Sequence, residues 1–459
     1  MTAPTALRHP RSAQTRLVGW RPDAVSALTL YVILLFVLPA RLVVPAMGAA
    51  GRPADLFGLV LLGWWILSGL TPGGFPRKAS PLTVALWARF GIILLSLVFG
   101  MNRELLPGEA LAADRFVLST LGFMGVALVA ADGIRTRAQL DKLLQRMTYA
   151  GGFIALVALF QFNFNLDATR LFQIPGLDFN TDQYGIQQRW AFRRVAGTAN
   201  HAIEFAVVTG MMLPLAIHYA MHAEKGKVQQ RKWALVALIA TGIPFSVSRA
   251  GVLAVTVALL TLAMAWPTRR RVNGLFISIL GLCALFVVVP GIVGTIIDLF
   301  QRAGNDSSIS ARTDDYPLVY EYIRAQPWLG RGAGTWIVDQ YFTLDNEILG
   351  TLVQTGYLGL ITTVAVWVVG FALPRDVRHH SDDDETRHLA QAIAAVVVVS
   401  LVTTVTFDSF AFPIHTGFLM LALGAGSALW SIERRERQSA ADVHRAGIET
   451  VDPVGNSPT

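Results

Sequence analysis

The chain has 459 residues, of which 53% are hydrophobic and 15% charged, and its mean hydropathy is +0.49. Soluble domains carry a larger charged fraction, so this composition excludes a soluble enzyme and indicates a protein that lies in lipid. The net charge of +7 comes from short basic clusters between apolar runs. That distribution is typical of membrane topology rather than of a nucleic-acid-binding surface.

The N-terminal segment 1–23 is basic, and the apolar stretch after it is longer than the core of a signal peptide. We therefore expect a retained first helix. Apolar stretches long enough to cross about 30 Å of hydrocarbon predict an all-α, polytopic membrane helix bundle of about twelve spans within residues 24–431. The spans lie near residues 24–47, 54–70, 82–100, 114–131, 148–165, 198–220, 232–247, 250–266, 273–297, 347–373, 388–406 and 412–431.

Lys and Arg fall in alternate loops, and cationic loops stay on the cytoplasmic side during insertion. This predicts a multi-pass protein of the inner (plasma) membrane with both termini in the cytoplasm. Two connections on the opposite, external side, about 165–198 and 299–346, exceed the usual loop length and are the candidate functional regions. The polar tail, residues 432–459, is predicted to be a disordered cytoplasmic segment.

The one cysteine, Cys283, lies in an apolar run, so the chain has neither a disulfide framework nor a thiolate metal site. Within the predicted spans, Arg89 and Glu204 are costly unless they are paired or face water. Both are candidate functional residues for that reason. For Arg89 we favour a role in bracing a contact between helices.

The segment Ser246-Val247-Ser248-Arg249-Ala250-Gly251 lies at the tight external junction between the seventh and eighth predicted spans. Ser248 can cap the helix that follows, which would place Arg249 beside backbone N–H groups at a positive helix end. The segment therefore predicts an anion site. The alternative is an interfacial arginine that binds lipid headgroups.

Arg312 lies in the second long loop, and a run of alternating glycines follows at Pro327-Trp328-Leu329-Gly330-Arg331-Gly332-Ala333-Gly334. These glycines predict a sharp turn that returns the loop to the membrane. Asp345-Asn346 is then separated by nine residues from Gly356-Tyr357-Leu358-Gly359. Together with the Ser-Arg-Ala junction, this order of parts resembles the O-antigen ligase and polymerase family over about residues 194–360.

The resemblance implies a membrane glycosyltransferase that works on the external face without a cofactor or a metal. Its donor would be a polyisoprenyl-diphosphate-linked glycan, and its acceptor a saccharide, lipid or protein. Membrane lipid is an expected partner and nucleic acid is not. A diphosphate needs concentrated positive charge as the glycosidic bond breaks, and arginine supplies it through bidentate donors. We assign that role to Arg249 and Arg312.

The family pattern has a histidine before the asparagine, whereas this chain has Asp345 there. The family histidine is taken to activate the acceptor hydroxyl. A carboxylate can act as general base when its pKa is suitable, so Asp345 is the candidate base. Asp345 is also a good N-cap for the tenth span, and one residue could serve both roles.

Four further residues are candidates for substrate binding, namely Arg193, Arg194, His201 and His415, and Asn346 joins them as part of the matched motif. The stretch from Arg194 to His201 resembles the family's Arg-x-x-Gly segment before its next span. The arginines could hold phosphate or pair with acidic residues of the same loop. The histidines could instead be ordinary polar anchors at the membrane interface.

Two other functions remain open from the sequence. Twelve spans with cytoplasmic termini also suit a secondary transporter, although no repetition between the two halves is visible. A member of the family could also bind lipid-linked glycan without transferring it. Ligase and polymerase share the donor and differ in the acceptor, so the sequence does not separate them.

Overall fold

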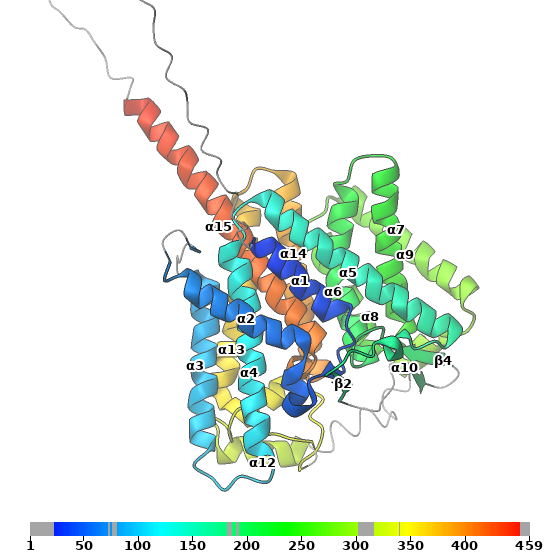
Figure 1. The fold of residues 1–459 in the computed structure, drawn as a ribbon. Coiled ribbons are helices and arrows are strands. Elements are labelled where there is room, and N and C mark those ends of the chain that lie inside the picture. The colour runs from blue at the N-terminus through cyan, green and yellow to red at the C-terminus, as the bar shows by residue number, and fades with distance from the viewer. Residues whose placement is uncertain are drawn as a thin grey trace, which may run out of the picture.

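The structure is a computed structural model. It describes residues 23–71, 74–75, 80–180, 186–189, 192–301, 316–338 and 340–449. Within these residues the chain is a bundle of helices with two short antiparallel strand pairs (Figure 1). The strands are β1 (Leu42–Val43) with β2 (Asp178–Phe179), and β3 (Ile186–Arg189) with β4 (Phe192–Val195).

The helices follow one another along the chain with short connections. The first half contains α1 (Ala24–Phe36), η1 (Pro45–Gly51), α2 (Pro53–Ser68), α3 (Pro81–Gly100), α4 (Glu109–Gly133), α5 (Arg137–Phe164), η2 (Ala168–Leu171), α6 (Ala202–Met221) and α7 (Lys227–Phe245). The second half contains α8 (Arg249–Ala263), α9 (Thr268–Val288), α10 (Ile292–Gln301), α12 (Tyr316–Ala325), α13 (Glu347–His380), α14 (Asp384–Thr403), η4 (Thr404–Thr406), η5 (Ser409–Ala411) and α15 (Pro413–Glu449).

The predicted all-α, polytopic membrane bundle is confirmed. Among the described residues, eight helices are long and apolar enough to cross a membrane, and α1, α2 and α8 are shorter apolar helices. Each predicted span overlaps a helix, while the number of twelve spans stays a prediction. The first span is shorter than expected, because α1 has 13 residues, about 20 Å of helix, and the chain then turns at Pro39 toward β1.

Two other boundaries differ from the prediction. The ninth span ends at Val288, and Gly291, with φ of +88°, separates it from α10. The tail does not become irregular at residue 432, because α15 continues as a helix to Glu449. The residues from 450 onward lie outside the described part of the chain.

Helix α6 is the centre of the bundle and packs against α7, α8 and α14. Its contact with α8 is close because small residues face each other. A Cβ atom added to Gly251 of α8 would lie 2.7 Å from the Cβ of Ala206, and one added to Gly210 of α6 would lie 2.7 Å from the Cβ of Ala254. Such small-residue stripes let membrane helices approach. The pairing also shows that α6 and α8 run parallel, so both begin at the same end of the bundle.

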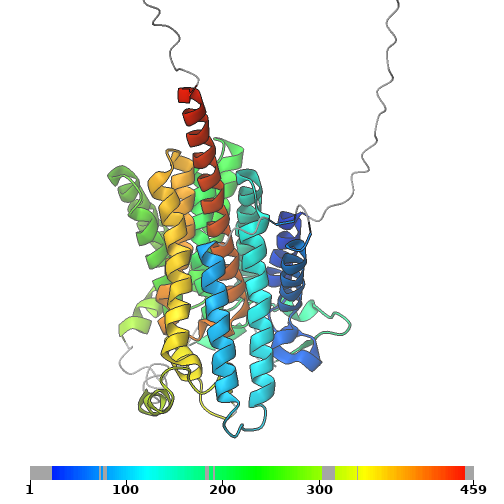
Figure 2. The ribbon, with the colours of Figure 1, turned by 90° about the vertical axis from the view of Figure 1, so that its left-hand side faces the viewer.

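The bundle has two distinct ends. We call the end where α1, α5 and α14 begin the tail end, because α15 projects from it (Figures 1 and 2). Gln139 donates a hydrogen bond to Asp23 at 3.4 Å, Arg137 to Thr386 at 2.6 Å, and Arg435 to the Arg135 carbonyl at 3.1 Å. The described N-terminus and the projecting part of α15 therefore share this end.

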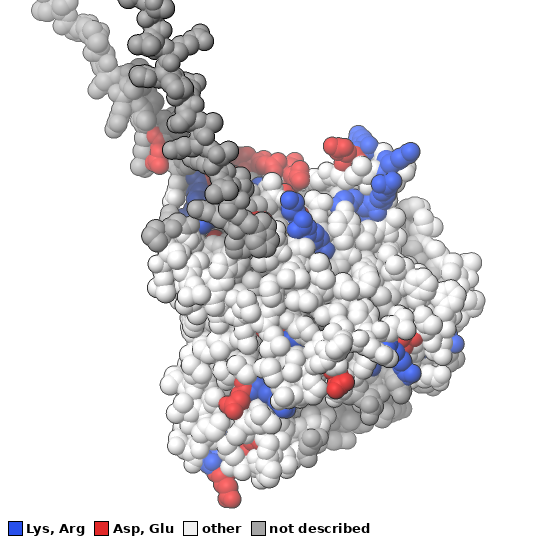
Figure 3. Space-filling model, in the orientation of Figure 1, with Lys and Arg blue, Asp and Glu red and all other residues white. Residues whose placement is uncertain are grey.

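We call the opposite end, where α6, α8, α13 and α15 begin, the loop end. Helix α12 lies there (Figure 2). Charged side chains lie toward both ends of the face in Figure 3, and the band between them is almost free of them.

Candidate functional site at the loop end

The β3–β4 hairpin docks on the junction between α7 and α8. Arg194 on β4 donates a hydrogen bond from Nε to the carbonyl of Ser246 at 3.1 Å. Val247 has φ of +46°, a strained conformation for a β-branched residue. Strain of this kind often accompanies function. Arg249 is the first residue of α8 and follows this turn directly. Arg194 is thus bonded to the turn, and Arg249 is next to it in the chain.

Ser248 does not act as predicted at this junction. It occupies the N-cap position of α8, but its side chain makes no capping hydrogen bond, and the residue is buried. The first N–H groups of α8 are therefore not covered by the Ser248 hydroxyl. This leaves the positive end of α8 beside Arg249 without the cap that the sequence suggested.

Arg193 points to the end of α5. Its Nη1 donates hydrogen bonds to the carbonyl oxygens of Phe162 at 3.0 Å and Asn163 at 3.4 Å. A cation on the last carbonyls of a helix is favourable because the helix dipole is negative there. Arg193 therefore binds the hairpin to α5, whereas its neighbour Arg194 binds it to the junction of α7 and α8.

The start of α6 is held rigidly. Gly197 and the Gln161 side chain exchange two hydrogen bonds, at 2.8 and 2.9 Å, and Gly197 has φ of +61°. His201 is the N-cap of α6, because its Nδ1 accepts the N–H of Ile203 at 3.2 Å. The predicted histidine therefore has a structural role at the end where the candidate site lies.

Glu204 is fully buried one turn further along α6. Its carboxylate accepts the N–H groups of Asn200 at 2.8 Å, Ile414 at 2.7 Å and His415 at 3.3 Å. The last two are the first N–H groups of α15, which have no partner within the helix. Glu204 thus joins the starts of α6 and α15, and these hydrogen bonds offset the free-energy cost of burying its carboxylate.

His415 does not face a space where substrate could bind. Its side chain is completely buried, Nε2 lies 3.2 Å from the Ser400 hydroxyl, and Nδ1 lies 3.1 Å from the Ser409 carbonyl. Both ring nitrogens are therefore engaged inside the bundle. The predicted substrate-binding role of His415 is not supported, and its contacts are those of a satisfied core histidine.

The start of α13 is capped by Asn346, not by Asp345. The Asn346 side-chain oxygen accepts the N–H groups of Ile348 at 3.0 Å and Leu349 at 3.3 Å. The expectation that Asp345 caps this helix is therefore wrong. Its neighbour takes that role, and Asp345 precedes the cap in the half-buried loop.

Glu347 fixes α13 to the segment before α15. Its backbone N–H donates to the Phe407 carbonyl at 3.3 Å, and its carboxylate accepts the N–H of Phe410 at 2.9 Å. The ring of Phe412, at the other end of the same segment, lies 6.3 Å from the ring of His201. The starts of α6 and α13 thus flank one short segment, residues 407–412.

Helix α13 is broken at Gly356, which has φ of +64° and ψ of −166°. The break is used by the loop before it. The N–H of Tyr357 donates to the Pro327 carbonyl at 2.7 Å, and the N–H of Leu358 donates to the Trp328 carbonyl at 3.2 Å. The backbone groups that the break frees are therefore satisfied by the loop.

The predicted glycine turn packs against this break. Gly330, Gly332 and Gly334 have φ values of +65°, +122° and +75°. The N–H of Gly332 donates to the Gln354 carbonyl at 3.1 Å, and a Cβ on Gly330 would collide with the backbone of Gln354. The spacing from Asn346 to Gly356 thus has a physical meaning, because it sets the length of helix between the cap and this docking point.

A buried ion pair beside the glycine turn was missed by the sequence reasoning. Arg331 bonds the Glu109 carboxylate at 3.0 Å and the Tyr341 hydroxyl, and Arg103 pairs with Glu109 at 2.8 Å. Three aromatic rings surround the guanidinium carbon of Arg331, at 5.3, 5.5 and 4.2 Å, and these are the rings of Tyr322, Trp336 and Tyr341. The only sequence signal was a charged residue between glycines.

Arg89 braces two helices, as expected. Its Nε on α3 donates to the Thr363 hydroxyl of α13 at 3.1 Å, and its guanidinium lies 4.8 Å from the centre of the Phe410 ring. Arg89 and Glu347 therefore both contact the segment of residues 407–412, each through Phe410.

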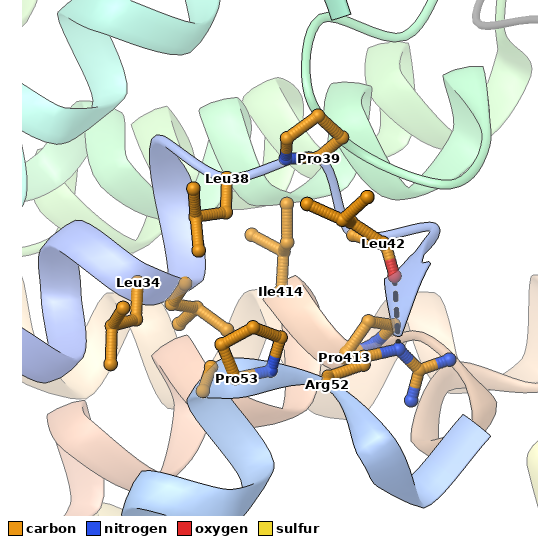
Figure 4. Close-up of a pocket in the computed structure, with 11 residues that line it drawn as sticks. Leu34, Leu38, Pro39, Leu42, Arg52, Pro53, Pro413 and Ile414 are labelled. Atoms are coloured by element: carbon orange, nitrogen blue, oxygen red, sulfur yellow. Dashed lines mark hydrogen bonds between the residues drawn. The ribbon is translucent and has the colours of Figure 1, made fainter. Parts of the chain in front are cut away.

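Of the predicted residues, the structure places Arg194, Arg249, His201, Asp345 and Asn346 at the loop end, on elements that contact one another. Arg312 lies outside the described residues. An apolar cleft between the end of α1 and the starts of α2 and α15 is lined by Leu34, Leu38, Ile414 and neighbours, with Arg52 bound to the Ala40 carbonyl at 3.0 Å (Figure 4). None of the predicted residues lines this cleft.

Comparison with known proteins supports the resemblance seen in the sequence. Residues 234–364 match the family model described as O-antigen ligase. The match begins in α7 and extends past the break of α13, so it includes the strained junction, the glycine turn and the cap at Asn346. A search of curated proteins finds no match for the chain.

Proposed function

We propose, from the O-antigen ligase domain that the chain contains at residues 234–364, that this membrane protein transfers a glycan from a polyisoprenyl diphosphate to an acceptor hydroxyl. The observation that carries the proposal is that Arg194 binds the Ser246 carbonyl in the strained turn of the matched domain, and that Arg249 begins α8 directly after this turn. Transfer takes place at the loop end, which is the external face when the basic tail end is cytoplasmic.

The diphosphate of the donor is held by Arg249 and Arg312. A diphosphate that leaves carries growing negative charge, and fixed guanidinium groups stabilise that charge more in the transition state than in the ground state. The N-terminus of α8 adds a partial positive charge beside Arg249. Arg194 supports this arrangement through the Ser246 carbonyl and acts as a positioning residue.

Asp345 is the proposed general base. The acceptor oxygen attacks the anomeric carbon, the bond from that carbon to the diphosphate oxygen breaks, and the hydroxyl proton moves to the Asp345 carboxylate. The anomeric configuration inverts because attack and departure occur on opposite faces. Asn346, rather than Asp345, caps α13, and a positioned carboxylate can act as general base in such a transfer.

The other predicted residues take smaller parts. His201 and Asn346 position the starts of α6 and α13 on the two sides of residues 407–412. Arg193 and His415 hold structure through carbonyl and hydroxyl contacts, so we assign them no contact with substrate. Transfer itself needs no metal in this proposal.

The test is a transfer assay with the purified full chain, a polyisoprenyl diphosphate oligosaccharide and candidate acceptors. We expect Arg249→Ala and Asp345→Asn each to lower the turnover number by about 100-fold or more, the loss typical of one oxyanion donor or one acid–base group. Arg249→Lys keeps the charge but not the bidentate geometry and should recover only part of the activity.

The matched controls are Arg324→Ala and Glu321→Gln, which change charged residues exposed on α12. Both should transfer glycan at the unmodified rate. Full activity in Arg249→Ala or Asp345→Asn would remove the role assigned to that residue. Uptake of a solute into liposomes without any transfer would instead favour a transporter.

A further inference from the structure

Three histidines meet at the tail end of the bundle, far along the helices from the proposed transfer site. His218 lies in the last turn of α6, His222 ends that helix, and His388 lies near the start of α14. One ligand nitrogen from each lies within 4.8 Å of the others, and this is the group of His, Cys, Asp or Glu side chains that could hold a metal ion among the described residues. His218 and His388 are buried, whereas His222 is half-buried.

The hydrogen bonds define which nitrogens are available. His222 Nδ1 lies 2.9 Å from the His218 carbonyl oxygen. A carbonyl only accepts hydrogen bonds, so Nδ1 carries the proton and Nε2 keeps its lone pair. This is the arrangement of metal-binding histidines, whose second nitrogen donates to a carbonyl or carboxylate and thereby fixes the ring.

The same reasoning applies to the buried pair. The indole N–H of Trp266 donates to His388 Nε2 at 2.8 Å, so the proton of His388 lies on Nδ1. That proton is donated to His218 Nδ1, 3.0 Å away. His218 Nε2 is then left protonated, buried and without a partner. This buried polar atom costs free energy, and the cost is the same whether or not a cation is bound at Nδ1.

We propose that His218, His222 and His388 form a binding site for a transition-metal cation such as Zn²⁺, which joins α6 to α14. Three neutral imidazoles suit Zn²⁺, Co²⁺, Ni²⁺ or Cu²⁺ and do not suit Mg²⁺ or Ca²⁺, which prefer oxygen ligands. Arg137, Arg270 and Arg378 act electrostatically on the cluster. Their charge gives a cation no attraction, so binding rests on metal–nitrogen bonds.

The two buried histidines are already spaced for a shared zinc ion. Zinc–nitrogen bonds of about 2.1 Å in tetrahedral geometry place ligand nitrogens about 3.4 Å apart, and His218 Nδ1 and His388 Nδ1 are already 3.0 Å apart. The His388 proton moves from Nδ1 to Nε2, which makes Nδ1 a ligand. His388 Nε2 then carries an N–H that faces the indole N–H of Trp266, so the hydrogen bond between them breaks and the indole moves away. His222 Nε2 is the third ligand, and water fills the fourth position.

The test uses the full chain in detergent, purified without a polyhistidine tag and stripped of metal by a chelator. Calorimetric titration with Zn²⁺ should give one ion per chain. His222→Gln and His388→Gln should each weaken binding by at least about tenfold. His380→Gln is the matched control, because His380 is exposed on α13 and next to Asp376. It should bind as the unmodified chain does.

A second measurement does not depend on the folding of variants. Titration of the unmodified chain with Co²⁺ should give the intense visible absorption of a four-coordinate site, together with a change in tryptophan fluorescence that is absent in Trp266→Phe. A Zn²⁺ affinity unchanged in His222→Gln would overturn the proposal. So would Co²⁺ that shows only the weak spectrum of the hydrated ion.

Discussion

At the scale of single residues, Gly356 shows how one missing side chain permits the architecture of the loop end. Its φ of +64° and ψ of −166° lie in a region that only glycine adopts readily. A Cβ there would also collide with the backbone of Trp328. The residue therefore allows both the break in α13 and the close approach of the glycine turn.

Gly356→Ala should destabilise the protein by about 2–4 kcal/mol, the combined cost of a strained backbone and overpacking. The control is Gly350→Ala in the same helix, where the nearest atom to an added Cβ is 4.0 Å away. This variant should unfold at or above the unmodified midpoint because alanine favours helix. Thermal unfolding in detergent measures both, and equal midpoints for the two variants would contradict the account.

Tyr341 gives the buried ion pair a dependence on pH. Burial, and then the bond to the Glu109 carboxylate, raise the pKa of Tyr341 above its usual value of 10.0. The neutral phenol is thus favoured in the folded protein. The contribution of neutral Tyr341 to the free energy of unfolding is complete below pH 10. It is lost as the pH rises further, because Tyr341 ionises at a lower pH in the unfolded chain than in the folded protein.

The difference in unfolding midpoint between the unmodified protein and Tyr341→Phe should therefore shrink between pH 9 and pH 11. Below that range it should be constant, with the unmodified protein more stable by about 1–2 kcal/mol for the lost hydrogen bond to a charged group. A difference that grows with alkaline pH would show that Tyr341 is ionised in the folded state.

At the scale of elements, the starts of α6, α13 and α15 are joined by two carboxylates rather than by apolar contact alone. Glu204 accepts N–H groups from α15, and Glu347 accepts one from the segment 407–412. These bonds fix the ends of three helices relative to one another. They are the reason that residues far apart in sequence hold one arrangement at the loop end.

Glu204→Ala should leave three N–H groups without their acceptor and lower the free energy of unfolding by about 2–4 kcal/mol. Glu204→Gln keeps one acceptor oxygen and should lower the free energy of unfolding by less than Glu204→Ala does. Glu321→Ala on exposed α12 should change nothing. The midpoints of thermal unfolding rank the stability of the variants. If Glu204→Gln unfolds at the same midpoint as Glu204→Ala, the role of Glu204 as an acceptor is contradicted.

The sequence predicted the elements better than their contacts. Apolar stretches located the helices, and the order of short motifs indicated the family, because both signals are local. The pairing of Arg331 with Glu109 joins residues 222 positions apart, and the contact of His218 with His388 joins residues 170 positions apart. No local pattern contains such contacts. The bond between His415 and Ser400 was not predicted for the same reason, since it forms only when α14 and α15 pack together.

At the scale of the whole molecule, the proposed orientation places the loop end outside the cell. The background for its test is Cys283→Ser, which removes the single, exposed cysteine. Arg324→Cys on α12 should then react with a membrane-impermeant maleimide in intact cells. Lys227→Cys at the start of α7 should react only after permeabilisation. The reverse pattern would invert the topology and the face on which transfer occurs.

The central claim is that arginines at the loop end grip the diphosphate of a lipid-linked donor. The most direct measurement is an electron cryo-microscopy structure of the full chain with a bound polyisoprenyl diphosphate oligosaccharide. The account predicts diphosphate oxygens within hydrogen-bond distance of Arg249 and Arg312, with the Asp345 carboxylate facing the anomeric carbon. A diphosphate bound elsewhere, with Arg249 on lipid headgroups, would contradict it.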